Sequence, residues 1–269
     1  MNWGEIVNRN GNPFPSFDMS GKVVIVTGAT TGIGYAAAHA FAYCGAKVVV
    51  TSRKQTDCDR VQCEMEELGR ECLGLQADSG KQEDVENLIA KTLERFGRID
   101  VLVNNAGIGG PVKDLVDTTE EEWDTVHEIN LRGVYMLSRR AAKVMMDQGE
   151  GGSIINIASI SGLDGKGQHG IYGSAKGGVL ALTRYLAYEL GKYNIRANAI
   201  CPGFILTEII RWAAQDPGIR EELESMCAMH IIGEPSDIGN TAVFLASDMA
   251  SYMTGTAVVI DGGMSVSPV

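Results

Sequence analysis

A tyrosine and a lysine four residues apart are the first side chains whose types and spacing could support acid–base chemistry. Tyr172 and Lys176 belong to the stretch Tyr-Gly-Ser-Ala-Lys. If this stretch begins a helix, the two side chains share one face and lie one turn apart. A phenol beside a fixed ammonium can then donate a proton. The spacing alone does not identify a site, because it occurs twice more, in Tyr43 with Lys47 and in Tyr188 with Lys192.

A glycine-rich stretch near the amino end predicts a pyrophosphate site. Residues 27–34 read Thr-Gly-Ala-Thr-Thr-Gly-Ile-Gly and follow the apolar run 23–27. The N–H groups of such a loop, at the start of a helix, can bind phosphates, and its glycines let the chain turn sharply and approach them. The spacing is GxxxGxG, not the GxGxxG of the general dinucleotide fingerprint, so an ordinary turn between a strand and a helix stays the alternative.

The end of the next apolar run indicates which nicotinamide cofactor the chain uses. An acidic residue about 20 positions past the loop would bind the ribose of NAD. Here residues 51–54 read Thr-Ser-Arg-Lys, without an acid. The planar fork of Arg53 can face a 2′-phosphate, and Ser52 is small enough to leave room for it. We therefore expect NADP(H) in preference to NAD(H), with a solvated surface arginine as the alternative.

The elements that must position these residues alternate between apolar strands and helices, which indicates parallel βαβ units. The pattern predicts a single α/β domain with a doubly wound, seven-stranded parallel Rossmann-type sheet and helices on both faces. The predicted strands are 23–27, 47–51, 72–76, 100–104, 153–158, 195–200 and 257–260. The predicted helices are 35–44, 56–68, 81–96, 119–146 and 171–192.

The length of 269 residues and 45% hydrophobic content are enough for one large core. Residues 1–20 hold Pro13 and Pro15 and form a predicted amino-terminal extension, and residues 21–269 form the domain. The irregular stretch 204–235 is an insertion within that domain. It does not form a domain of its own.

Charge and cysteine usage narrow the partners and the compartment. The formal charge is −11 without a basic block, which argues against nucleic acid or an anionic membrane and favours a small-molecule partner. The six cysteines are scattered, without a CxxC pair or zinc-type spacing. We expect reduced thiols, no bound metal, and a cytoplasmic protein without a signal peptide or membrane span.

Taken together, the motifs resemble those of the short-chain dehydrogenase/reductase family. They comprise the glycine stretch, Asn-Asn-Ala-Gly at 104–107, Asn130, Ser159, the Tyr172 stretch and Pro-Gly at 202–203, in that family's order. The resemblance covers residues 20–263. It also separates the three tyrosines, because the family places a serine thirteen residues before its catalytic tyrosine, as Ser159 stands before Tyr172. Structural packing is the better interpretation of the other two pairs.

The resemblance implies a role for each catalytic candidate. Tyr172 is the general acid in reduction and the base in oxidation, Ser159 binds the substrate oxygen, and Lys176 holds the nicotinamide ribose. Asn130 holds a water in a proton relay, although a mid-helix Asn can simply bond a neighbouring backbone group. The expected cofactor contacts are Gly28, Thr30, Thr31, Gly32, Ile33, Gly34, Ser52, Arg53, Asp78, Asn104, Ala106, Gly107, Tyr172, Lys176, Pro202, Gly203, Ile205 and Thr207. For Asp78 a turn role is the alternative.

Electrostatics supports this use of Tyr172 and Lys176. A free tyrosine has a pKa of about 10, and catalysis near neutrality needs a drop of roughly three units, or about 4 kcal/mol. A cation about 4 Å away supplies an energy on the order of 4 kcal/mol at an effective dielectric near 20. We therefore expect Lys176, with an oxidised nicotinamide, to lower the pKa of Tyr172.

The substrate is less well defined than the reaction. The stretch 204–235 stands where the family has a mobile substrate lid, and its apolar side chains favour a bulky hydrophobic substrate. These side chains include Ile205, Leu206, Ile209, Ile210, Trp212, Met226 and Met229. They can equally pack the lid onto the body, and Glu208, Arg211 and His230 leave room for polar contacts.

Residues 203–210 are similar to hydroxysteroid dehydrogenases of the family, which favours an NADP-dependent alcohol dehydrogenase or carbonyl reductase for hydroxysteroids. Gluconate, sugar-alcohol and 3-oxoacyl reductases of the same family are the alternatives. A non-catalytic NADP(H) sensor is the alternative of another class, although the complete catalytic set argues against it. The family is usually dimeric or tetrameric, so we expect a homo-oligomer, for example a homotetramer.

Overall fold

The computed structural model describes residues 16–208, 210 and 215–266, and seven parallel strands form one sheet in this part of the chain. Their order across the sheet is β3-β2-β1-β4-β5-β6-β7, which is the doubly wound arrangement. The seven-stranded Rossmann-type prediction is therefore confirmed. The strands are β1 (Val23–Thr27), β2 (Lys47–Ser52), β3 (Cys72–Gln76), β4 (Val101–Asn104), β5 (Gly152–Ile157), β6 (Ile195–Pro202) and β7 (Ala257–Ile260).

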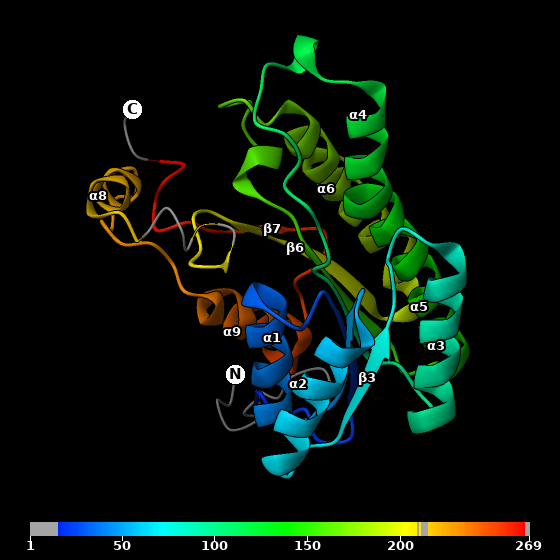
Figure 1. Ribbon diagram of the computed structural model, residues 1–269. Coiled ribbons are helices and arrows are strands. Elements are labelled where there is room, and N and C mark those ends of the chain that lie inside the picture. Colours follow the sequence, from blue (N-terminus) through cyan, green and yellow to red (C-terminus); the bar gives the residue numbers. More distant parts are fainter. Residues whose placement is uncertain (1–15, 209, 211–214, 267–269) are drawn as a thin grey trace, which may run out of the picture.

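Two layers of helices cover the sheet, one on each face (Figure 1). The helices α1 (Gly32–Tyr43), α2 (Gln55–Glu67) and α9 (Pro235–Ala246) pack on one face, and α3 (Gln82–Phe96), α5 (Val134–Gln148) and α6 (Gly170–Leu190) on the other. The central strand β1 is buried along its whole length, as expected for a parallel strand covered on both sides. The carboxyl ends of the strands are thus the part of the sheet left for a ligand.

The stretch 119–146 does not form the single helix that the sequence predicts. It divides into α4 (Glu120–His127), a π-helical turn η3 (Glu128–Gly133) and α5. Thr119 and Glu122 form a capping box at the start of α4. The π-helical turn holds Asn130, which is fully buried. A π turn inserts an extra residue into the helix, and such turns are frequent at functional sites.

The predicted lid contains regular structure that its sequence did not reveal. Helix α8 (Pro217–Ser225) begins after Asp216, whose carboxylate accepts hydrogen bonds from the Gly218 and Ile219 amides. Ile205 forms a parallel bridge with Gly233, which joins the two ends of the segment. Ile209, Arg211 and Trp212 of the predicted lid lie outside the described residues, as do residues 1–15 of the predicted extension.

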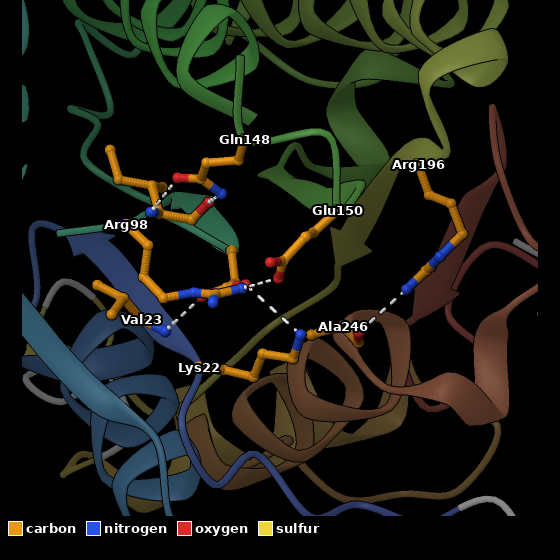
Figure 2. A network of polar contacts seen from close by, with 9 residues as sticks. Lys22, Val23, Arg98, Gln148, Glu150, Arg196 and Ala246 are labelled. Carbon is orange, nitrogen blue, oxygen red and sulfur yellow. Dashed lines mark hydrogen bonds and ion pairs between the residues drawn. The ribbon is translucent and has the colours of Figure 1, made fainter. Parts of the chain in front are cut away.

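A polar network fixes the amino ends of the strands, opposite the ligand edge (Figure 2). Arg98 donates to Asp100 at 2.8 and 2.6 Å and to Glu150 at 2.6 Å, and Asp100 accepts from the Val23 amide at 2.9 Å. Burial alone would raise the pKa of Asp100, but the hydrogen bonds from Arg98 and Val23 lower it below its usual value. This network joins β1 to the start of β4, at the opposite edge of the sheet from the carboxyl ends of the strands.

Candidate active site

The glycine stretch forms a tight loop between β1 and α1 that only glycine allows at several positions. Gly28 and Gly32 have φ angles of +61° and +55°, in the left-handed region. A Cβ atom on Gly34 would lie 2.3 Å from the Gly28 carbonyl oxygen and 2.4 Å from Nδ2 of Asn105. The loop is thus packed to contact distance on its inner side, and its amides lie at the carboxyl edge of the sheet, as a phosphate cradle requires.

The loop after β4 is hydrogen-bonded directly to the glycine loop. Asn105 Nδ2 donates to the carbonyls of Thr27 at 2.8 Å and Gly28 at 3.0 Å. In return, Thr27 Oγ1 accepts from the amides of Asn105 and Ala106, each at 3.0 Å. These hydrogen bonds therefore join the two loops to each other. The sequence prediction named Ala106 as a cofactor contact but missed Asn105, although it stands in the same motif.

Asn104 lies beneath these loops, with its side chain turned into the core. It is 2% exposed, and its Nδ2 donates to Ser138 Oγ at 2.9 Å and to Asn156 Oδ1 at 2.8 Å. The cofactor contact of Asn104 therefore stays a prediction, and it concerns the main chain alone. Its side chain positions the loop from below and joins β4 to β5 and α5.

The predicted catalytic residues lie near one another, and two of them border Gly107. Tyr172 and Lys176 lie in the first two turns of α6, and the Tyr172 and Ser159 side chains share a hydrogen bond. A Cβ atom on Gly107 would lie 3.0 Å from Asn130 Oδ1 and 3.5 Å from Lys176 Nζ. The absence of a side chain at Gly107 therefore leaves space beside both groups.

Asn130 and Lys176 are held by main-chain groups of neighbouring segments. Asn130 Oδ1 accepts from the Ile108 amide and its Nδ2 donates to the Ile108 carbonyl, both at 2.8 Å. Lys176 Nζ donates to the carbonyl of Ile157 at 2.8 Å. The alternative interpretation of Asn130, a bond to backbone, is thus observed, but its partner is the loop after β4 and lies outside its own helix. The contact ties the π-helical turn to the predicted ligand edge.

The pKa values in the site differ in direction from the sequence expectation. Burial raises the pKa of Tyr172 above its ordinary value, although the hydrogen bond with Ser159 acts to lower it. Burial lowers the pKa of Lys176 to about 8. The predicted lowering of the tyrosine pKa by Lys176 is therefore not found in the protein chain itself. Desolvation is the largest cause of both shifts, and Lys176 is not among the groups that lower the pKa of Tyr172.

Cys201, which belongs to none of the sequence motifs, lies next to this group. Cys201, near the end of β6, is fully buried, and burial raises the pKa of its thiol to about 11, against opposing effects of the Ser159 backbone and Lys176. It is thus a neutral side chain that packs behind Ser159. The other two tyrosines of the repeated spacing are surface residues, since Tyr43 is 81% exposed and Tyr188 is 88% exposed. Their predicted packing role is wrong.

The residues predicted to face the adenosine half of a cofactor lie at the ends of β2 and β3. Arg53 is exposed at the end of β2. Ser52 Oγ accepts from the Lys54 amide at 3.2 Å and lies 3.6 Å from Cys58 Sγ, so it fixes the turn into α2. Asp78 accepts a hydrogen bond from the Gly80 amide at 3.0 Å, which is the turn role stated as its alternative.

The start of the lid lies against the glycine loop. Pro202 is buried, and a Cβ atom on Gly203 would lie 2.7 Å from Asp261 Cβ. Thr207 Cγ2 is 3.2 Å from the position of a Cβ on Gly32. The predicted cofactor contacts not yet placed, Thr30, Thr31, Ile33 and Ile205, stand in the glycine loop, the start of α1 and the lid. These loops gather at the carboxyl edges of β1 and β6.

Comparison with known proteins agrees with this fold. The family model described as enoyl-(acyl carrier protein) reductase matches residues 28–265. An L-rhamnose 1-dehydrogenase (NAD(P)(+)) from Sphingomonas sp. (strain SKA58) is 40% identical over 251 residues, which cover 93% of this chain and 98% of that protein. A 7alpha-hydroxysteroid dehydrogenase from Bacteroides fragilis is 36% identical over 247 residues, covering 91% of this chain and 95% of that protein.

A solved structure supports the same assignment. The crystal structure of a short-chain type dehydrogenase/reductase from Mycobacterium marinum superposes with a TM-score of 0.87 at 35% identity, over 93% of this chain and 98% of that one. The chain therefore belongs to the short-chain dehydrogenase/reductase family, whose members are oxidoreductases that use a nicotinamide cofactor.

Two further findings concern membranes and metals. Across residues 16–208, 210 and 215–266, no helix is both long and apolar enough to span a membrane. The same residues hold no cluster of three or more histidine, cysteine, aspartate or glutamate side chains that could bind a metal ion.

Proposed function

We propose that the protein is an NADP(H)-dependent dehydrogenase that interconverts a secondary alcohol and a ketone, with Tyr172 as the proton donor and acceptor. The observation that carries the proposal is the grouping of four side chains: Asn130 and Lys176 lie beside Gly107, Lys176 lies over the Tyr172 ring, and Tyr172 is hydrogen-bonded with Ser159. Tyr172 and Lys176 come from α6, Asn130 from η3 and Ser159 from the segment after β5, so a shared function explains their proximity better than local packing does. The complete set also argues against a non-catalytic sensor.

The loops fit a nicotinamide dinucleotide. The glycine loop is packed so tightly on its inner side that a side chain on Gly34 would collide with Gly28, and Gly107 leaves room beside Lys176. A bound nicotinamide supplies the hydride donor or acceptor, which no side chain of the protein can replace. The glycine loop would hold its phosphates, and Lys176 would hold its ribose.

The side chains around Gly107 then divide the remaining chemistry. Ser159 lies in hydrogen-bond contact with Tyr172 and can bind the substrate oxygen at the same time. Tyr172 Oη gives a proton to that oxygen in reduction and takes one in oxidation. Asn130 fixes the loop of Ile108 on the other side of Gly107. In oxidation, the positive charge of the cofactor is what would offset the raised pKa of Tyr172.

The preference for NADP(H) rests on the end of β2. Residues 51–54 offer no carboxylate for a ribose 2′-hydroxyl, whereas Arg53 is exposed there and Ser52 is small. A strong preference for NAD(H) in steady-state assays would contradict this assignment. The L-rhamnose 1-dehydrogenase relative is described as using NAD(P)(+), so both cofactors belong in the assay.

For the substrate we propose a ring hydroxyl of a carbohydrate as the first candidate. Its support is the group of L-rhamnose 1-dehydrogenases that are 40% identical to the chain over more than nine-tenths of its length. A hydroxysteroid is the second candidate, supported by the 7alpha-hydroxysteroid dehydrogenase relative and by exposed apolar side chains on the segments beside the site. These side chains include Val112, Leu115, Leu163, Met229 and Ile231.

One assay separates these candidates. L-rhamnose, gluconate, other polyols and a 7α-hydroxysteroid are each supplied with NADP or NAD, and the nicotinamide absorbance is followed. Turnover of the sugar with a kcat/KM far above that of the steroid supports the first candidate, and the reverse supports the second. Cofactor binding without turnover of any alcohol or ketone would support the sensor instead. We further propose that the enzyme acts in the cytoplasm as a dimer or tetramer.

A further inference from the structure

An arginine of α2 is fixed against the glycine loop. Arg60 Nη2 donates to the carbonyl of Thr30 at 2.8 Å, and its Nη1 donates to Glu64 at 2.7 Å. Thr30 stands between the first two glycines of the loop. The contact crosses from one βα unit to another, and it places a guanidinium beside the loop that would bind phosphates.

Arg60 also borders a cavity of about 410 Å³ whose wall includes Thr30, Thr31 and Gly32. It is the cationic residue of that wall. A guanidinium has five N–H donors, and two of its nitrogens are engaged with Thr30 and Glu64. The side chain is 47% exposed. Donors are therefore left for an anionic oxygen that enters from the cavity side.

Helix α2, which carries Arg60, begins just after Arg53 at the end of β2. The thiol of Cys58 lies 3.6 Å from Ser52 Oγ and 3.4 Å from the carbonyl of Leu75, which packs the first turn of α2 onto the ends of β2 and β3. Arg53 follows Ser52 directly, and Arg60 is half a turn past Cys58. Arg53 thus stands exposed at the end of β2, and Arg60 contacts the glycine loop through the Thr30 carbonyl.

We propose that Arg60 is a specificity-determining residue for NADP(H), which contacts the phosphate on the 2′ position of the adenosine ribose together with Arg53. This inference rests on the proposed NADP(H) preference. Arg53 supplies the exposed charge, and Arg60 supplies an arginine whose orientation is already fixed by two hydrogen bonds. Preorganisation of this kind reduces the side-chain entropy lost on binding.

Glu64 makes the inference testable, because it orients Arg60 while its negative charge would repel the phosphate that Arg60 attracts. Its carboxylate accepts from Arg60 and from the Tyr35 hydroxyl at 3.0 Å. Burial acts to raise the pKa of Glu64, but the hydrogen bonds from Arg60 and Tyr35 lower it overall, so the group is ionised at neutral pH. Glu64→Gln removes the negative charge and keeps an acceptor oxygen for Arg60.

The test measures binding by calorimetry with two probes, adenosine 2′,5′-bisphosphate and adenosine 5′-monophosphate. Arg60→Gln should weaken the bisphosphate about tenfold and leave the monophosphate within about twofold. Glu64→Gln should strengthen the bisphosphate about two- to threefold, since it removes a like charge. Arg95→Gln, an exposed arginine of α3 that does not border the cavity, carries the same charge loss and should change neither.

Three results would overturn the inference. If Arg60→Gln weakens both probes equally, Arg60 only supports the glycine loop. If Arg60→Gln and Glu64→Gln both weaken binding, the pair acts as a structural bridge. The cofactor proposal is judged separately, because wild-type protein that binds both probes equally would contradict it. A preference for the bisphosphate that is lost in Arg53→Gln but kept in Arg60→Gln would leave the cofactor proposal intact. That result would reject the role of Arg60.

Discussion

Lys176 Nζ lies 5.5 Å from the centre of the Tyr172 ring and donates its hydrogen bond to the carbonyl of Ile157. The ammonium thus lies over the face of the phenol ring, within the range of a cation–π attraction. Its hydrogen bond goes to the last residue of β5, the strand that leads to Ser159. Lys176 therefore positions the start of α6 on the sheet, in addition to any contact with a cofactor ribose.

Tyr172→Phe tests the proton-transfer role. General acid–base catalysis contributes about 10²- to 10⁴-fold, so kcat should fall by at least about 100-fold while the dissociation constant of the cofactor changes little. Steady-state rates and a fluorescence titration with NADPH measure the two effects. Tyr188→Phe is the matched control, since Tyr188 has the same spacing to a lysine but is 88% exposed. Near-native turnover of Tyr172→Phe would show that another group transfers the proton.

The pH dependence of the two reaction directions should differ. Burial raises the pKa of Tyr172, so the phenol is protonated at neutral pH. Reduction uses the protonated phenol, so its rate should not rise between pH 7 and 10. Oxidation needs the deprotonated phenol, so its rate should rise about tenfold or more until the pH reaches the pKa of Tyr172 in the cofactor complex. Initial rates at saturating substrate measure both profiles. An oxidation rate that stays flat over this range contradicts the assignment of Tyr172 as the base.

The core of the fold was predictable because it depends on local patterns. The β-branched run of β1 and the glycine loop after it need only neighbouring residues to specify a strand, a turn and a helix. The π-helical turn at Asn130 was not, because its stabilising contact is the main chain of Ile108, 22 residues away. The composition of residues 119–146 predicts one uninterrupted helix.

The same limit applies to the site's electrostatics and to Arg60. The sequence placed Tyr172 and Lys176 together, but their pKa directions depend on how deeply both are buried, which spacing does not give. Arg60 is half-exposed on a helix with several charged residues, and nothing in its local sequence separates it from a solvated surface arginine. Only its contact with Thr30, thirty positions earlier, does so.

The buried charge of Lys176 should lower the free energy of unfolding of the protein. Burial lowers its pKa from 10.5 to about 8, so the folded chain disfavours the charged form. The penalty is complete below pH 8 and is relieved as the pH rises from about 8 to 10.5. Lys176→Met should therefore stabilise the cofactor-free protein at pH 7 by up to about 3 kcal/mol, less about 1 kcal/mol for the hydrogen bond to Ile157.

Urea unfolding at pH 7, 9 and 10 measures this effect, and the advantage of the variant should shrink as the pH increases. Lys192→Met, which removes an exposed lysine, provides the control for charge loss at the surface. A stability difference that does not change between pH 7 and 10 would mean that Lys176 keeps its ordinary pKa in the folded protein.

Gly34→Ala should disable the ligand edge without touching a catalytic side chain. The new Cβ would lie 2.3 Å from the Gly28 carbonyl oxygen and 2.4 Å from Asn105 Nδ2, and backbone cannot move aside as a flexible side chain does. Because Asn105 joins the two loops, the clash should separate them and weaken cofactor binding by about tenfold or more. Gly191→Ala, where no atom lies within 4 Å, is the control. Unchanged affinity for NADPH in Gly34→Ala would show that the joined loops do not form the cofactor cradle.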